Sequence, residues 1–194
     1  ASARAAIEEL ERLGIETTMI SGDNEGAARH VAKQLGLSRY RLSEYPAATD
    51  NTLKAKDLYK KLYGTEDKNY TACLNTLGFL YNVQAKYSDA EKTFQEARQI
   101  NLRLTGGEDM QYARIINNLA DVYCNLNRYD QADELYQTSL RIKEKISGRQ
   151  SRDYANTLYN LAEFQSGLGK YGQAKTTVQE GIAIFAALNE TNHP

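Results

Sequence analysis

The feature that most constrains this chain is a repeat with a period of 42 residues. When the sequence is compared with itself at that offset, several sets of aligned positions hold the same residue three times. We call each set of aligned positions a column. Residues 69–194 therefore divide into three full units, 69–110, 111–152 and 153–194, and a fixed period of this length indicates a repeat architecture. The clearest columns are Tyr70, Tyr112 and Tyr154; Leu77, Leu119 and Leu161; Ala90, Ala132 and Ala174; and Ile100, Ile142 and Ile184.

Each unit is predicted to be a helical hairpin. Ile116, Leu119 and Tyr123 follow the spacing of one helix face, and a second helix is expected after the turn at Tyr129. Gly148 should end that second helix, as Gly106 ends its equivalent, because glycine readily adopts the left-handed conformation that closes a helix. One hairpin cannot bury its apolar stripe alone, so neighbouring units should stack into a mainly α solenoid.

The periodicity also extends towards the N-terminus. Leu58, Leu62 and Gly64 lie 42 residues before Ile100, Leu104 and Gly106. Residues 47–68 are therefore predicted to be a partial unit, with the second helix of that unit at 47–63. Pro46 suits the first turn of this helix, where no backbone N–H is needed.

These units resemble the tetratricopeptide repeat. The resemblance rests on Leu119-Ala120, Tyr123, Tyr129 and Ala132, and on Gly169-Lys170-Tyr171 in the third unit. The 42-residue length and the segment Ile116-Asn117-Asn118-Leu119-Ala120 are similar to the longer variety found in kinesin light chains. The resemblance implies a noncatalytic scaffold that binds a peptide or a partner protein in a concave groove lined by the first helices.

The polar face of the first helices is the candidate peptide-binding site. Several asparagines lie on this face, and a carboxamide can both donate to and accept from a peptide backbone. The resemblance implies that the second asparagine of the Asn-Asn pair does this, which corresponds to Asn118 and Asn160. Lys143, on a preceding second helix, is expected to add a charge, while a solvated face without a ligand is the alternative interpretation. The candidate residues are Asn75, Arg114, Asn117, Asn118, Asp121, Asn125, Lys143, Asn156, Tyr159, Asn160 and Glu163.

Residues 1–46 have a different pattern. A helix is expected over 1–14, a strand over 15–20 and a helix over 25–35, which predicts a small α/β fragment. The segment Met19-Ile20-Ser21-Gly22-Asp23-Asn24 resembles part of the phosphorylation domain of heavy-metal-transporting P-type ATPases, which has a haloacid-dehalogenase-like fold. The resemblance implies a vestigial phosphate-binding role for Ser21. The nucleophilic Asp-Lys-Thr-Gly-Thr segment of that family does not occur in the sequence, which favours a trimmed chimera or a natural fusion.

Composition excludes several classes of function. The net charge of −1 gives no general attraction to nucleic acid or to an anionic membrane. The longest apolar run, residues 182–188, has seven residues, whereas crossing a bilayer takes about 20. Cys73 and Cys124 are expected to be structural, and no cofactor, metal site or catalytic grouping is predicted. A cytoplasmic protein is the expectation.

The sequence thus favours a protein-binding scaffold and leaves two alternatives open. One is an enzyme with ATP-linked or phosphatase-like activity inherited from residues 1–46, which an ATP turnover assay would detect. The other is a designed assembly without a native function. The last helix carries Ile182, Ile184, Phe185 and Leu188, so self-association through this helix is a further expectation.

Overall fold

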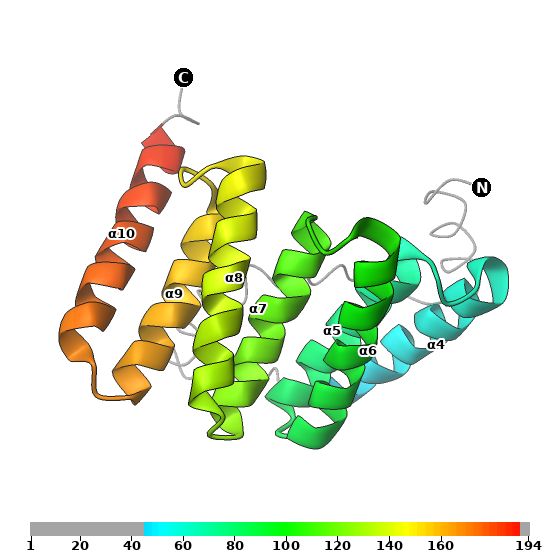
Figure 1. Cartoon of the computed structure of the whole chain (residues 1–194). Coiled ribbons are helices and arrows are strands. Elements are labelled where there is room, and N and C mark those ends of the chain that lie inside the picture. The colour runs from blue at the N-terminus through cyan, green and yellow to red at the C-terminus, as the bar shows by residue number, and fades with distance from the viewer. Residues whose placement is uncertain (1–44, 191–194) are drawn as a thin grey trace.

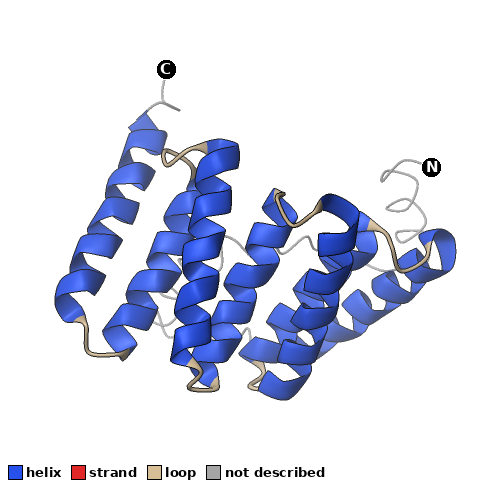
Figure 2. Ribbon diagram, in the orientation of Figure 1, coloured by secondary structure: helices blue, strands red, loops and turns tan. Residues whose placement is uncertain are grey.

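The computed structural model of the chain describes residues 45–190, all of whose regular structure is α-helical. Figure 2 shows helices joined by short turns throughout this range, with no strand within it. The strand predicted at 15–20 and Ser21 lie outside the described residues. The helices are α4 (Tyr45–Tyr63), α5 (Lys68–Val83), α6 (Tyr87–Thr105), α7 (Met110–Asn125), α8 (Tyr129–Ser147), α9 (Arg152–Gly167) and α10 (Tyr171–Glu190).

The described helices pair into successive hairpins. α5 with α6, α7 with α8, and α9 with α10 form three successive hairpins, and these hairpins lie side by side in chain order (Figure 1). α4 packs against α5 from the position of a second helix. It begins at Tyr45, two residues before the predicted start, so the expected boundary at 46/47 falls within its first turn.

The first helix of each hairpin begins at a residue whose side chain caps it. Asp67, Asp109 and Ser151 occupy one column, and each accepts a hydrogen bond from the backbone N–H three residues later. Such a cap satisfies one of the amide groups that a helix start leaves without a partner. The same short polar residue type, repeated every 42 residues, therefore sets where three helices begin.

The turn inside each hairpin requires one left-handed residue. Ala85, Asn127 and Gly169 share a column and have φ values of 59°, 58° and 73°. Glycine adopts this conformation without steric cost, whereas an L-residue does not. This geometry explains the Gly-x-Tyr motif of the third unit. The other two units have the less favourable residues Ala85 and Asn127 at the same position.

The two layers of helices are packed differently. The first helices α5, α7 and α9 contact one another directly, in addition to their contacts within hairpins. No comparable contact joins α6 with α8, or α8 with α10. Because the first helices approach one another more closely than the second helices do, the stack curves with α5, α7 and α9 on its inner side.

The core fills the space within and between the hairpins. Ile116, Leu119 and Ala120 on α7 are fully buried between the neighbouring helices. In the first hairpin Gly78 occupies the column of Ala120, and a Cβ there would lie 2.9 Å from the ring of Phe94. Small residues in this column thus allow the two helices of a hairpin to pack around a large side chain.

Candidate functional site

Amide side chains join the first helices of the first two units. Asn118 Nδ2 donates to Asn75 Oδ1 at 3.1 Å, and Asn125 Nδ2 donates to Asn82 Oδ1 at 2.9 Å. One step earlier along the helices, Gln111 Nε2 donates to the Lys68 carbonyl at 2.9 Å. These three contacts recur every seven residues, or about two helical turns. We call them the amide ladder.

The amide ladder contains side chains that the sequence predicts to bind a ligand, namely Asn75, Asn118 and Asn125. Asn117 and Asn118 are only 4% and 5% exposed, and Asn117 Nδ2 donates to Asn118 Oδ1 at 3.4 Å. Asn117 Oδ1 is buried and has no hydrogen-bond partner among the described residues. Asn125 remains exposed. In the first two units these amides therefore fix one helix against the next, and Asn117 and Asn118 leave little surface open to a ligand.

The contact between the second and third units has a different chemistry. Arg114 on α7 donates to Asp153 on α9 at 3.1 Å, which forms a partly exposed ion pair. Lys143 is fully buried, and its Nζ donates to Thr157 Oγ1 at 2.8 Å. The predicted role of Lys143 was a charge at the groove, but in the structure its ammonium lies inside the interface between α8 and α9.

Asp121 also has an internal partner. Tyr136 Oη donates to Asp121 Oδ1 at 2.5 Å, and Cys124 Sγ lies 3.6 Å from the same hydroxyl. Burial raises the pKa of Tyr136 well above its ordinary value. Burial likewise raises the pKa of Cys124 to about 12, and that of Cys73 to about 12. Both thiols are therefore held in the neutral, unreactive form.

The third unit leaves its amides available. The side chains of Asn156 and Asn160 on α9 are half-buried, and neither makes a hydrogen bond within residues 45–190. Tyr159 is half-buried beside them, and its pKa is raised by burial and then by the charge of Glu163. Glu163 itself is exposed. Of the predicted residues, this group on α9 is the one that can most readily contact a ligand.

Sequence reasoning missed the partners in these contacts. The pattern of one unit does not identify Asn82, Asp153 or Thr157, although the ladder has a signal in the full sequence. Each ladder pair is 43 residues apart, one more than the repeat period, because a residue on one first helix contacts the next position along the neighbouring helix. A search for polar pairs at the repeat period plus one would have found Asn75 with Asn118 and Asn82 with Asn125.

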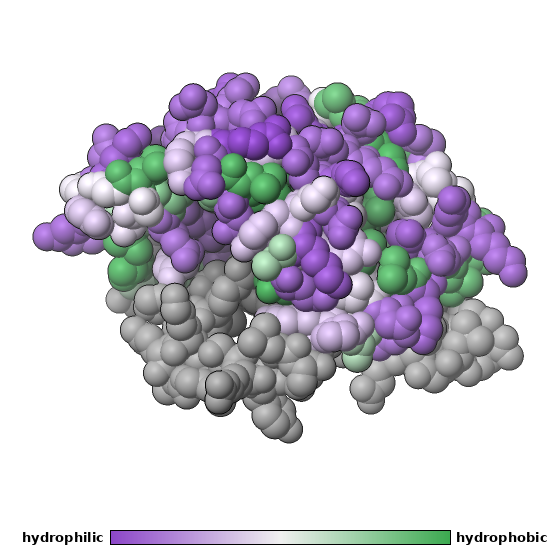
Figure 3. Space-filling model, turned by 90° about the horizontal axis from the view of Figure 1, so that it is seen from below, coloured by the Kyte–Doolittle hydropathy of each residue, from purple (hydrophilic) through white to green (hydrophobic). Residues whose placement is uncertain are grey.

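The described surface is mainly polar (Figure 3). Between residues 45 and 190, no three His, Cys, Asp or Glu side chains are grouped so that they could hold a metal ion. None of the helices in that range has the length and apolarity needed to cross a membrane. Seen from below, the described part of the molecule is mostly hydrophilic, with separate hydrophobic patches (Figure 3). Such a surface suits hydrogen bonding to a polar or polypeptide ligand.

Comparisons with known proteins define the class of the repeats. The tetratricopeptide repeat family matches residues 71–109 and residues 111–187. The segment from 71 to 187 therefore consists of tetratricopeptide repeats, as the sequence predicted. Such repeats generally form non-enzymatic scaffolds that bind peptide or protein partners. No curated protein matches the chain.

Two similar solved structures have the same kind of fold. BtubC (BKLC) from P. vanneervenii is 21% identical with a TM-score of 0.65, over 98% of this chain and 74% of that one. A single-residue variant of a putative kinesin light chain of Podosopora anserina, with nearly identical TPR-like repeats, is 17% identical with a TM-score of 0.61. That match covers 96% of this chain and 88% of the other. At these identities the likeness supports the fold, a kinesin-light-chain-like stack of tetratricopeptide hairpins.

Proposed function

We propose that the protein is a noncatalytic scaffold that binds an extended segment of a partner protein along the inner layer of first helices, chiefly over α9. The observation that carries this proposal is the contrast between units. Asn75, Asn82 and Asn118 are hydrogen-bonded to neighbouring helices, whereas the Asn156 and Asn160 amides have no internal partner among the described residues. Amides without a partner on a partly enclosed surface can pair with the N–H and C=O groups of an extended peptide.

Charged residues beside these amides would orient the ligand. The Arg114 and Asp153 ion pair lies on the α7 side, and Glu163 is exposed one turn beyond Asn160. Because both signs are present, the surface suits a peptide of mixed charge better than a uniformly basic or acidic one. Asn117, Asn118 and Asn125 would contribute mainly by holding α7 in register, and Lys143 by supporting α8 against α9.

The experiment begins with selection of peptides from a random library on the full chain. The dissociation constants of the selected peptides are then measured for the native chain and for the double variant Asn156→Ala/Asn160→Ala. We expect the double variant to bind about 1 to 3 kcal/mol more weakly, since each lost ligand hydrogen bond contributes about 0.5 to 1.5 kcal/mol.

A matched control removes two amides from the second helices. Gln137 on α8 and Gln173 on α10 are exposed, and Gln137→Ala/Gln173→Ala should leave the affinity unchanged. Circular dichroism should report the same helix content for all three proteins. Selected peptides that bind the Asn156→Ala/Asn160→Ala protein as tightly as the native chain would place the ligand elsewhere and reject the proposal.

A further inference from the structure

Helix α10 carries an apolar stripe that is open to solvent. Tyr171, Val178, Ile182 and Phe185 are separated by seven, four and three residues, so they share one face of the helix. Tyr171 is 70% exposed and Ile182 is 61% exposed, while Val178 and Phe185 are half-buried. We call these four residues the α10 stripe.

The equivalent stripe on α8 is covered by the first helix of the next unit. It comprises Tyr129, Tyr136, Leu140 and Lys143. The ring centroid of Phe164 on α9 lies 6.2 Å from that of Tyr129 and 5.7 Å from that of Tyr136. At the other end, Lys143 donates to Thr157 of α9. Helix α9 therefore contacts both ends of the α8 stripe, in which Tyr136, Leu140 and Lys143 are buried and Tyr129 is 40% exposed.

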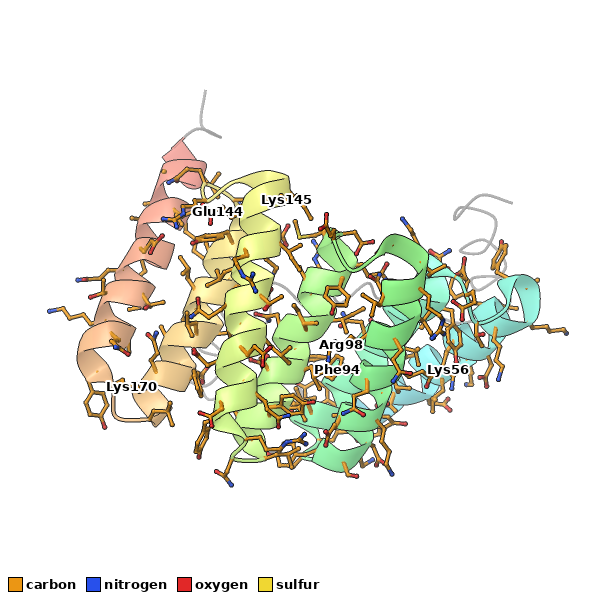
Figure 4. The ribbon with its side chains drawn as sticks, viewed as in Figure 1. Lys56, Phe94, Arg98, Glu144, Lys145 and Lys170 are labelled. Atoms are coloured by element: carbon orange, nitrogen blue, oxygen red, sulfur yellow. The ribbon has the colours of Figure 1, made fainter. Side chains whose placement is uncertain are left out.

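The equivalent stripe on α6 is covered in the same way by α7. It comprises Tyr87, Phe94, Arg98 and Asn101. Phe94 and Asn101 are fully buried, and Arg98 Nε donates to Tyr112 Oη at 3.2 Å. Figure 4 shows Phe94 and Arg98 on neighbouring turns of the same helix. Both covered stripes thus have one kind of occupant, an amphipathic helix.

The α10 stripe is more apolar than the two covered ones. Its last two residues are Ile182 and Phe185, where α6 has Arg98 and Asn101 and α8 has Leu140 and Lys143. An apolar face that is partly exposed in this way is typical of an interaction surface. The two covered stripes show how a helix would lie on α10, because the same columns pack against α7 in the first unit and against α9 in the second.

The charge beside the stripe is reversed in α10. In one column the units carry Glu91, Asp133 and Lys175. Glu91 accepts from Arg128, which follows α7, at 2.6 Å. In the third unit Lys170 occupies the column of Arg128, in the turn between α9 and α10 (Figure 4). If the helix bound on α10 were followed by a basic residue, as α7 and α9 are, that residue would lie beside Lys175 and repel it. An acidic residue at the same place would attract Lys175.

We propose that the α10 stripe is the docking surface for an amphipathic helix of a partner protein. This helix takes the position on α10 that α9 takes on α8, with a large apolar residue at the place of Phe164 and an acidic residue six positions later, facing Lys175. Self-association through α10 is the rival occupant. Among the described helices of a second copy, α7 and α9 are already packed between other helices, so neither of them is available to take this position. This surface is separate from the amides of α9, so either proposal can fail alone.

The test uses the full chain and a helical peptide whose sequence is residues 151–170 with Lys170→Glu, stabilised by a lactam and labelled with fluorescein. Fluorescence anisotropy should show saturable binding. The peptide with the native Lys170 should bind about two- to fivefold more weakly, which is the usual range for one exposed ion pair. Lys175→Glu in the protein should reverse this preference, and added salt should reduce it.

The protein variants identify the surface. Ile182→Asp, at an exposed position, should weaken binding at least tenfold and leave the circular dichroism spectrum unchanged. Ile146→Asp is the matched control, because Ile146 is 45% exposed on α8 and lies outside the stripe columns. Lack of saturable binding, or equal binding by the Ile182→Asp protein, would overturn the proposal. If sedimentation velocity shows a dimer that Ile182→Asp abolishes, the occupant is a second copy and the proposal is overturned. If the Lys175→Glu protein still prefers the peptide with Lys170→Glu, the proposed pairing of an acidic residue with Lys175 is overturned.

Discussion

Single residues in one column show how the repeat tolerates local strain. The turn within each hairpin places Ala85, Asn127 and Gly169 in the left-handed region. Asparagine can adopt this conformation more readily than alanine because its side chain can bond locally. Ala85 is thus the least suitable residue of the three, and it is exposed, so its side chain contributes little packing.

Replacing Ala85 by glycine should stabilise the protein. Relief of the left-handed conformation is worth about 1 to 2 kcal/mol, and the greater flexibility of glycine in the unfolded chain offsets about 0.5 to 1 kcal/mol of that. We therefore expect the free energy of unfolding in urea to rise by about 0.5 to 1 kcal/mol. Gly169→Ala is the converse control and should destabilise by a similar amount. A lower stability for Ala85→Gly would contradict this account.

The two cysteines should be unreactive in the folded protein. With pKa values of about 12, roughly one thiol in ten thousand is ionised at pH 8. Ellman's reagent should therefore react far more slowly with the native chain than with the chain unfolded in urea. Rapid reaction of either thiol in the native protein would show that its helix opens frequently.

The same thiols give stability a pH dependence. Their ordinary pKa is 9.0, and in the folded chain it is raised. Above about pH 9 the unfolded chain loses protons that the folded chain retains, so the free energy of unfolding falls as the pH rises further. Urea titrations at pH 8 and pH 10 should show this decrease, and a Cys73→Ala/Cys124→Ala variant should show a smaller one.

At the scale of helices, the amide ladder determines how α5 lies against α7. Asn118 has a central place in it, because its amide donates to Asn75 and accepts from Asn117. Amides in such an arrangement specify the register of two helices more strongly than an apolar contact does, because a shift of one position breaks every pair.

Asn118→Ala should therefore destabilise the fold. Its removal leaves the partly buried Asn75 amide and the buried Asn117 amide without their partner, at a cost of about 1 to 3 kcal/mol. Asn75→Ala should cost less in the Asn118→Ala background than alone, which a double-mutant cycle in urea would measure. Asn156→Ala, where the amide has no internal partner among the described residues, is the control and should change stability by less than about 0.5 kcal/mol. Additive effects of Asn75→Ala and Asn118→Ala would contradict the ladder.

The helices could be predicted well and the site only in part. Hairpins, glycine ends at Gly106 and Gly148, and the helix at 47–63 follow from periodicity, because apolar spacing and turn residues are local signals. Whether a polar residue on a first helix faces solvent or a neighbouring helix depends on the spacing between units, which the sequence of one unit does not contain. For this reason the sequence predicts Asn118 and Lys143 at a ligand surface, whereas the structure places both in contacts between helices.

The whole molecule is a linear stack in which each hairpin is stabilised by its neighbours. α7 contacts α5, α6, α8 and α9, and it is the most completely buried helix of the described part. α10 packs chiefly against α9 and leaves Tyr171 and Ile182 exposed. In such a stack the helices with one neighbour open more often than those with several.

Hydrogen exchange should reveal this gradient. We expect the slowest exchange in α7 and distinctly faster exchange in α10, measured by mass spectrometry on peptides from the intact chain. Binding of a helix to the α10 stripe would slow exchange in α10 selectively. Uniform protection from α5 to α10 would mean instead that the three hairpins unfold as one cooperative block.

The one-residue difference between the 42-residue period and the 43-residue ladder pairs has a consequence for how such a chain can change length. At the junction between the first two hairpins, α7 therefore lies one residue out of step with α5, relative to the repeat. If a whole 42-residue segment such as 111–152 were copied, the same offset would bring Asn117 opposite a second Asn118 at the new junction. The amide ladder could therefore continue into an array that is longer by complete repeat units.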